Sequence, residues 1–309
     1  MTEDKMRIYN GIHSFKTDIP TAVTVGKFDG FHLGHQDLLA ALLKEKQKGL
    51  RTVVMMLDFS AVSEVNSGNI LTHAEAEEYL QAAAVDVLLR VPVDAAFLSL
   101  SARAFIEEIL VNRLKTKTII SGPDFTFGHH REGDTEALRI AGKQYGFSLE
   151  IVPERVINGR TVSSSLIREE LSNGRIENAN FYLGHPFLIG GTVIHGNAFA
   201  RQWGYPTANI RPDTKKYLPK FGVYKVWAKI DGKMRPGMAN LGTKPTVTDA
   251  LEVILEVHFP GFEGDLYDRH ISVFFERFIR PEERFSSVDE LKAKIAEDVE
   301  RIRAERKRL

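Results

Sequence analysis

The feature that most constrains the fold is a change in the spacing of strand-like segments along the 309-residue chain. In the first half, short β-favouring runs alternate with stretches whose apolar residues recur every three or four positions. The strand-like runs are Thr21–Val25, Arg51–Leu57, Asp86–Val91 and Thr118–Ser121, and a helical stretch covers Ser101–Leu114. Because such alternation is typical of parallel pairing, we expect an α/β domain, a doubly wound parallel sheet with helices on both faces.

In the second half, strand-like runs follow one another closely without helices between them. They are Phe187–His195, Gly222–Ile230, Leu251–Phe259 and Ile271–Ile279, with a hairpin signal at Asp231-Gly232. This spacing predicts an antiparallel β-barrel. The capping box Ser287-Val-Asp-Glu290 predicts a final helix after it.

A short predicted helix, Arg175–Leu183, ends at Gly184-His-Pro186. We therefore predict a domain of residues 1–184 and a second domain of residues 185–309.

Composition excludes several classes of protein. The chain has 41 Lys and Arg against 41 Asp and Glu, so its formal net charge is zero, whereas nucleic-acid binders are usually basic. It has no cysteine, which argues against disulfides and fits a reducing compartment. The first residues lack an apolar signal region, and no run is long enough to span a membrane. We expect a cytoplasmic protein that binds neither nucleic acid nor membrane.

A glycine-rich segment, Gly26-Lys-Phe-Asp-Gly-Phe-His-Leu-Gly-His35, follows the first predicted strand. In parallel sheets, ligands bind beyond the carboxyl ends of the strands. His32 and His35 lie where a helix begins, and both the free N–H groups and the helix dipole there favour an anion such as phosphate. A capped helix start without a ligand is the alternative. The chain has no P-loop, the glycine-rich motif that most often binds the phosphates of ATP, so a P-loop site is excluded.

A second candidate for binding phosphate is Val162-Ser-Ser-Ser-Leu-Ile-Arg168. Ser163 or Ser164 can cap the helix that follows, and Arg168 lies one turn further on. Hydroxyls, free amides and a guanidinium that converge at a helix start make a site for pyrophosphate.

Two further segments of the second half carry candidate residues. In Gly204-Tyr-Pro-Thr-Ala-Asn-Ile210, Thr207 and Asn209 share one face of an extended segment, which suits a hard cation carrying phosphates; a polar turn is the alternative. In Leu251–Phe259 polar and apolar residues alternate, and Glu256 lies on the polar face, where it can simply be exposed to solvent.

These motifs resemble those of a known family. Gly26–His35, Gly122-Pro-Asp-Phe-Thr-Phe-Gly128 and Val162–Arg168 are similar to motifs of the nucleotidyltransferase superfamily in its FAD synthetase form. Gly204–Ile210 and Leu255-Glu-Val-His-Phe259 resemble the riboflavin kinase module. The chain therefore resembles the bacterial bifunctional FAD synthetases, which implies a nucleotidyltransferase domain followed by a riboflavin kinase barrel.

The resemblance implies roles for individual residues. In FMN adenylyl transfer it implies His32 and Arg168 as catalytic groups, and ATP binding by Gly26, Phe28, Asp29, His32, His35, Ser164, Ser165 and Arg168. It implies flavin binding by Asp124, Phe125 and Phe127, although the two phenylalanines can also be core residues. In the kinase it implies Glu256 as catalytic base, binding of ATP and Mg²⁺ by Gly196, Arg201, Thr207 and Asn209, and Thr207 and Asn209 as metal ligands.

The chain departs from the family after the second predicted strand. The family has Phe-Glu-Pro-His-Pro there, whereas this chain has Asp58-Phe-Ser-Ala-Val62. The resemblance implies that Mg-ATP phosphorylates riboflavin to FMN and then adenylylates FMN to FAD. Two alternatives stay open: a kinase whose adenylyltransferase half is degenerate, and a flavin-binding regulator without turnover.

Overall fold

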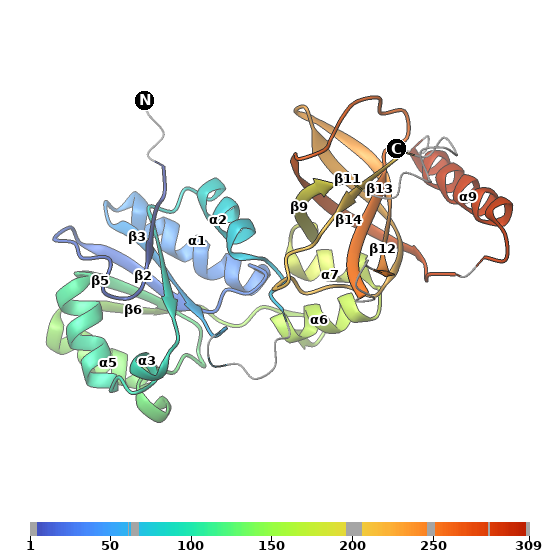
Figure 1. Ribbon diagram of the computed structural model, residues 1–309. Helices are drawn as coiled ribbons and strands as arrows, with labels where there is room; N and C mark the ends of the chain where they lie inside the picture. Colours follow the sequence, from blue (N-terminus) through green and yellow to red (C-terminus); the bar gives the residue numbers. More distant parts are fainter. Residues whose placement is uncertain are drawn as a thin grey trace. The chain divides into compact units, whose positions relative to one another are not determined.

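The computed structural model describes residues 5–60, 62, 68–195, 206–245, 251–283 and 285–306. The chain forms two compact units (Figure 1). The first consists of Met1–Ser67 and His73–Ser164, and the second of Gly68–Thr72 and Ser165–Leu309. This geometric division precedes the functional boundary expected at Gly184, which stays a prediction.

The first unit contains a parallel sheet of six strands within the described residues, in the order β1-β4-β3-β2-β5-β6, which confirms the predicted architecture. Its strands are β1 (Arg7–Asn10), β2 (Thr21–Gly26), β3 (Arg51–Asp58), β4 (Val87–Pro92), β5 (Thr116–Ser121) and β6 (Ser148–Ile151). From β2 the chain adds β3 and β4 on one side, then returns to add β5 and β6 on the other. The topological switch point therefore lies between β2 and β5.

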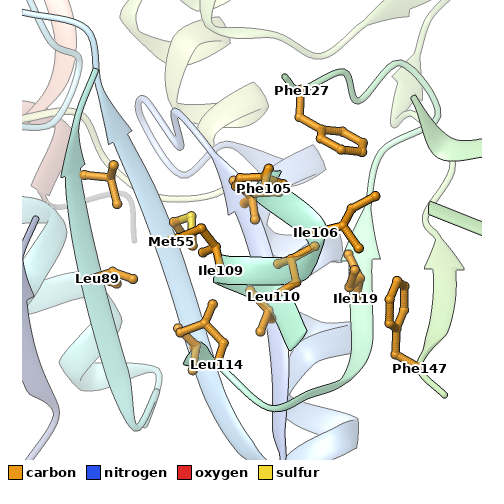
Figure 2. Close-up of a cluster of buried hydrophobic side chains, with 14 of the residues drawn as sticks. Met55, Leu89, Phe105, Ile106, Ile109, Leu110, Leu114, Ile119, Phe127 and Phe147 are labelled. Atoms are coloured by element: carbon orange, nitrogen blue, oxygen red, sulfur yellow. The ribbon is translucent and has the colours of Figure 1, made fainter. Parts of the chain in front are cut away.

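Helices cover both faces of this sheet. On one face, Met55 and Leu89 pack with buried residues of η1 (Phe105–Arg113) and α5 (Thr135–Tyr145), as Figure 2 shows for η1. On the other, α1 (Leu33–Gln47) packs on β2, β3 and β5 and contributes nothing to that cluster. The remaining elements are α2 (His73–Ala82), α3 (Ala95–Leu98), α4 (Ala102–Ala104), η2 (His129–Arg131), β7 (Val156–Ile157) and β8 (Arg160–Thr161).

The helical stretch expected at Ser101–Leu114 has an unexpected geometry. A single α-turn, α4, leads into η1, which is a π-helix of nine residues. Its buried residues Phe105, Ile106, Ile109 and Leu110 still lie on one side, facing the sheet (Figure 2). The apolar spacing thus identified the buried side but not the hydrogen-bonding pattern.

The second unit contains a closed barrel of six antiparallel strands within the described residues, in the order β10-β13-β12-β11-β14-β9. The strands are β9 (Leu188–Ile194), β10 (Thr207–Ile210), β11 (Gly222–Ile230), β12 (Lys233–Pro245), β13 (Leu251–His258) and β14 (His270–Arg280). At the predicted hairpin, Asp231 and Gly232 have φ angles of 50° and 75°, as a two-residue turn between β11 and β12 requires.

In the described part of the chain, three helices accompany the barrel: α6 (Ser164–Ser172), α7 (Ile176–Leu183) and α9 (Val288–Arg306). Half of the predicted capping box is present before α9: Ser287 Oγ accepts a hydrogen bond from Glu290 N at 3.2 Å, whereas the Glu290 carboxylate accepts from Ser286 N, at 2.9 Å. Inside the barrel, Leu241 of β12 and Leu255 of β13 are fully buried. The residues next to them, Asn240 and Glu256, therefore belong to the outer face.

Candidate active sites

The two glycine-containing segments of the first unit flank the switch point of its sheet. Gly26–His35 follows β2, and Gly122–Gly128 follows β5, the strand that pairs with β2. Open α/β sheets bind ligands at this position, beyond the carboxyl ends of their strands. The topology thus supports the binding role expected of both segments.

The segment after β2 is held in a strained but well-packed conformation. Phe28 and Phe31 have φ angles of 49° and 41°, a region that bulky residues rarely adopt. Their rings stack with centroids 5.5 Å apart, and the Phe31 ring also stacks on Tyr79 at 5.0 Å. Ser164 Oγ donates a hydrogen bond of 2.8 Å to the Asp29 carbonyl. These contacts fix the backbone between β2 and α1.

The two histidines are brought together at the start of α1. His32 immediately precedes the helix, its side chain does not cap it, and its imidazole stacks on that of His35. Gly34 leaves room for the His32 ring, because a Cβ there would lie only 3.3 Å from its ring atoms Cε1 and Nδ1. Burial, and secondarily the charge that His32 can carry, hold the pKa of His35 well below its ordinary value. His35 therefore acts as a neutral imidazole.

The residues predicted to bind ATP for adenylyl transfer are divided between the units. Gly26, Phe28, Asp29, His32, His35 and Ser164 belong to the first unit, and Ser165 and Arg168 belong to the second. Ser164 begins α6, and Arg168 lies one turn later on the same helix. The Arg168 guanidinium donates a hydrogen bond of 3.0 Å to the Gly68 carbonyl.

The residues predicted to bind flavin have different environments. Asp124 is exposed, Phe125 is partly buried against the core, and Phe127 belongs to the core, where its ring packs on Phe105 at 5.2 Å. The Phe127 backbone also pairs with Gly133 through two hydrogen bonds, of 3.0 and 2.9 Å. The packing role considered for one phenylalanine therefore applies to Phe127, while flavin binding by the three residues stays a prediction.

The segment that departs from the family begins at the last residue of β3. One oxygen of the Asp58 carboxylate accepts a hydrogen bond from Ser60 N at 2.9 Å, and the other lies 3.5 Å from His73 Nε2. His73 begins α2, and the sequence offered no signal for its approach to Asp58. The strand end of this chain thus carries a carboxylate–imidazole pair.

In the second unit, Thr207 and Asn209 line a cavity of about 540 Å³. The cavity is also lined by the segment after β13, including Phe259, Phe262 and the residues Glu263–Tyr267. Gly196 and Arg201, also predicted for this site, lie outside the described residues. The structure therefore places the two predicted metal ligands in one cavity, beside two carboxylate residues, Glu263 and Asp265.

The oxygen-rich lining suits a hard divalent cation. Asn209 Nδ2 donates to the Thr207 carbonyl at 3.5 Å, which leaves its Oδ1 available as a ligand. Hydroxyl, amide and carboxylate oxygens are the donors that Mg²⁺ prefers. The residues present thus fit Mg²⁺. Among the described residues there is no cluster of three or more His, Cys, Asp or Glu side chains that could hold a metal alone.

Glu256 lies beside this cavity on the outer face of the barrel. It is in register with Asn209 of β10 on one side and Asn240 of β12 on the other. Its carboxylate forms an ion pair with Lys244, and burial lowers the pKa of the Lys244 amine. Glu256 is therefore not a free solvent-exposed carboxylate, which was the alternative from the sequence. Sequence reasoning missed Lys244, because its distance from Glu256 becomes short only when β12 and β13 pair.

None of the helices in the described parts of the chain combines the length and apolar character needed to cross a membrane.

Comparison with known proteins gives matches for both units. A family described as FAD synthetase matches residues 14–166, and one described as Riboflavin kinase matches residues 183–305. A protein of Escherichia coli (strain K12), named bifunctional riboflavin kinase/FMN adenylyltransferase, is 38% identical over 302 residues, which cover 95% of this chain and 96% of that protein. One of Pseudomonas fluorescens with the same name is 37% identical over 310 residues, covering 97% of each chain.

A solved structure from Streptococcus pneumoniae, described as a macrolide-efflux protein, has a TM-score of 0.86 and 31% sequence identity. The match covers 96% of this chain and 99% of that chain. The two folds therefore agree over nearly their whole lengths.

Proposed function

The chain belongs to the family of bifunctional riboflavin kinase/FMN adenylyltransferases, and on that premise we propose how its own residues carry out the two reactions. The first phosphorylates riboflavin with ATP and gives FMN and ADP. The second transfers AMP from another ATP to FMN and gives FAD and pyrophosphate. We assign adenylyl transfer to residues 1–184 and the kinase to residues 185–309.

The observation that carries the kinase assignment is the register of Asn209, Glu256 and Asn240 beside a cavity that contains Thr207. Glu256 accepts the proton of the terminal ribityl hydroxyl as that oxygen attacks the γ-phosphorus. The bond between the γ-phosphorus and the bridging oxygen breaks, and ADP leaves. The Glu256 carboxylate also contacts the Lys244 amine in an ion pair.

Thr207 and Asn209 are the proposed ligands of Mg²⁺, and the carboxylate residues Glu263 and Asp265 line the same cavity. When bound, Mg²⁺ neutralises charge on the phosphates of ATP. The protein's own contribution is to hold the two ligand side chains on a strand that pairs on both sides, with β9 and with β13.

In adenylyl transfer, a phosphate oxygen of FMN attacks the α-phosphorus of ATP, and the bond to the departing pyrophosphate breaks. His32, supported by the neutral ring of His35, donates a hydrogen bond to the phosphates as negative charge develops. Arg168 acts on the same charge through its guanidinium. The switch-point location of Gly26–His35 supports this role.

A cytoplasmic location and small-molecule partners alone, riboflavin, FMN and ATP, belong to the same proposal. The absence of cysteine and the neutral overall charge support it.

Chromatography of the products from riboflavin and Mg-ATP tests the proposal. We expect FMN to accumulate first and FAD to follow, and EDTA to stop both steps. FMN without FAD at any FMN concentration would favour the kinase with a degenerate adenylyltransferase half. Bound flavin without ADP release would favour the regulator.

A further inference from the structure

A short segment from the first half of the chain, Gly68–Thr72, is built into the second unit and is called the strap below. Asn69 pairs in parallel with Lys216 through two backbone hydrogen bonds, from Asn69 N to the Lys215 carbonyl (2.6 Å) and from Tyr217 N to the Asn69 carbonyl (2.7 Å). Ile70 is fully buried, and the buried Lys216 Nζ donates to its carbonyl at 2.7 Å. The strap is therefore a fixed part of the second unit.

The first residue of the strap has to be glycine. Gly68 has a φ angle of 69°, and a Cβ there would lie 2.8 Å from Tyr217 N and 2.9 Å from the Lys216 carbonyl carbon and oxygen. These are backbone atoms, which cannot move aside as a flexible side chain can. The close approach of the two backbones brings the Gly68 carbonyl and the Tyr217 ring to the same guanidinium.

That guanidinium belongs to Arg168. Its Nη2 donates to the Gly68 carbonyl, and its Cζ lies 5.3 Å above the centre of the Tyr217 ring. The Tyr217 hydroxyl donates to the Arg168 carbonyl at 3.2 Å and is 2.5 Å from Ser172 Oγ, one turn further along α6. Tyr217 thus contacts Arg168 twice, with its ring at the charged end and with its hydroxyl at the backbone.

We propose that Tyr217, which lies within the residues assigned to the kinase, is a positioning residue for adenylyl transfer. This rests on the role proposed above for Arg168. An arginine side chain has several rotatable bonds, and a catalytic group displaced by about 1 Å can cost on the order of a hundredfold in rate. The Tyr217 ring and the strap carbonyl both hold the guanidinium, so a residue of the kinase half helps to set the geometry of a group that serves the other reaction.

The simpler alternative is that Tyr217 only stabilises the second unit. A purely structural role would lower both activities together, because the kinase residues lie in the same unit. A positioning role would lower the turnover of FAD formation and leave FMN formation at the parent rate.

The test uses two variants of the full chain. Tyr217→Phe keeps the ring but loses the hydroxyl contacts, and Tyr217→Leu loses both. We expect Tyr217→Leu to lower the kcat of FAD formation from FMN by roughly ten- to a hundredfold, with the KM for FMN unchanged and riboflavin phosphorylation intact. Tyr217→Phe, which keeps the ring, should retain most of the FAD-forming activity that Tyr217→Leu loses. Phe181→Leu, which removes an exposed aromatic ring from α7 in the same unit, is the matched control and should leave both rates unchanged.

A double-mutant cycle with Arg168→Ala decides whether Tyr217 acts through Arg168. If it does, Tyr217→Leu causes no further loss in the Arg168→Ala background. A full additional loss there, or equal losses of FMN and FAD formation in Tyr217→Phe, would overturn the inference. Parent-level FAD formation by Arg168→Ala alone would instead refute the role proposed for Arg168, and the inference with it.

Discussion

The imidazole rings of His32 and His35 stack with their centroids 3.7 Å apart and their planes 21° from parallel. Two protonated rings at this distance would repel each other strongly, and His35 is buried as well. The pair therefore carries at most one positive charge near neutral pH. His35 supports its partner as a neutral ring, and His32 remains the group that can donate to phosphate.

This relationship predicts a pH dependence of stability. Because the pKa of His35 is lower in the folded protein than its ordinary value of 6.5, the unfolded chain binds the extra proton more readily. The contribution of His35 is fully present above about pH 6.5 and is lost as the pH falls below it. His35→Asn should reduce the slope of unfolding free energy against pH below about pH 6.5, as measured by urea denaturation. An unchanged slope would show that other groups dominate.

The role of Glu256 predicts a selective loss of kinase activity. Glu256→Gln keeps the shape of the side chain but cannot accept the proton, so riboflavin phosphorylation should fall by about two to four orders of magnitude. FMN adenylylation should be unchanged. Glu252→Gln on the same face of β13 is the matched control, since Glu252 pairs with Arg211 instead. Kinase turnover within a few-fold of the parent would mean that Glu256 is only a surface residue.

The phosphate-binding groups predict the opposite selectivity. His32→Ala and Arg168→Ala should each lower FAD formation by roughly 100- to 1000-fold, because each removes a donor to charge that develops on the phosphates. FMN should still accumulate from riboflavin. Arg139→Ala, at an exposed ion pair on α5, controls for the loss of a positive charge. FAD formation at the parent rate in both variants would place the adenylyltransferase site elsewhere.

The segment that departs from the family predicts weak FMN binding. Its residues do not belong to the set that binds the phosphates, so FAD synthesis should show a raised KM for FMN with turnover less affected. Replacing residues 60 to 62 by Pro-His-Pro should lower that KM. The two prolines would also cost two hydrogen bonds. Ser60 N donates to Asp58 Oδ1 and Val62 N donates to the Phe59 carbonyl, and proline has no N–H to make either bond.

A single substitution, Ala61→His, restores the histidine of the family without introducing proline. It should lower the KM for FMN without the loss of those two hydrogen bonds. Steady-state kinetics with FMN varied at saturating Mg-ATP measures both variants. No FAD at any FMN concentration, with ATP still bound, would favour the kinase-only alternative.

The kinase should also work as a fragment. We expect residues from about Leu183 onward to phosphorylate riboflavin, since the predicted kinase residues all follow that point. A fragment that begins at Ser165 should melt at a higher temperature, because Asn180 of α7 bonds both the Phe275 carbonyl (2.8 Å) and Phe187 N (2.7 Å). Leaving such groups without partners costs about 1–3 kcal/mol each. A folded but inactive Ser165 fragment would contradict the assignment of the kinase to this part of the chain.

Much of the fold could be predicted from the sequence, because strand and helix periods are local patterns. The run Gly222–Ile230 is a strand with the predicted bounds, and the hairpin at Asp231-Gly232 joins it to the next strand. That next strand, β12, was not predicted over its length, because Pro236, Gly237 and Gly242 interrupt its pattern. Its pairing partners on both sides hold it in the barrel despite these residues.

The side-chain pairs of the candidate sites were harder to predict for a different reason. Lys244 with Glu256, His73 with Asp58 and Arg168 with Tyr217 each join residues whose approach depends on the completed fold. The Lys216–Ile70 bond spans 146 positions of the sequence. The periodicity of a short segment carries no information about such contacts. By contrast, His32 and His35, and Thr207 and Asn209, lie within short motifs, and their proximity could be predicted.

The strap has a consequence for how such enzymes can be recombined. A hybrid gene that joins the first half of one relative to the second half of another at a single junction would take Gly68–Thr72 from one parent and the Lys215–Tyr217 backbone that receives it from the other. The strap and the backbone that pairs with it therefore have to come from the same parent. Exchange of whole catalytic halves among relatives should therefore succeed only where the five transplanted strap residues match their new acceptor.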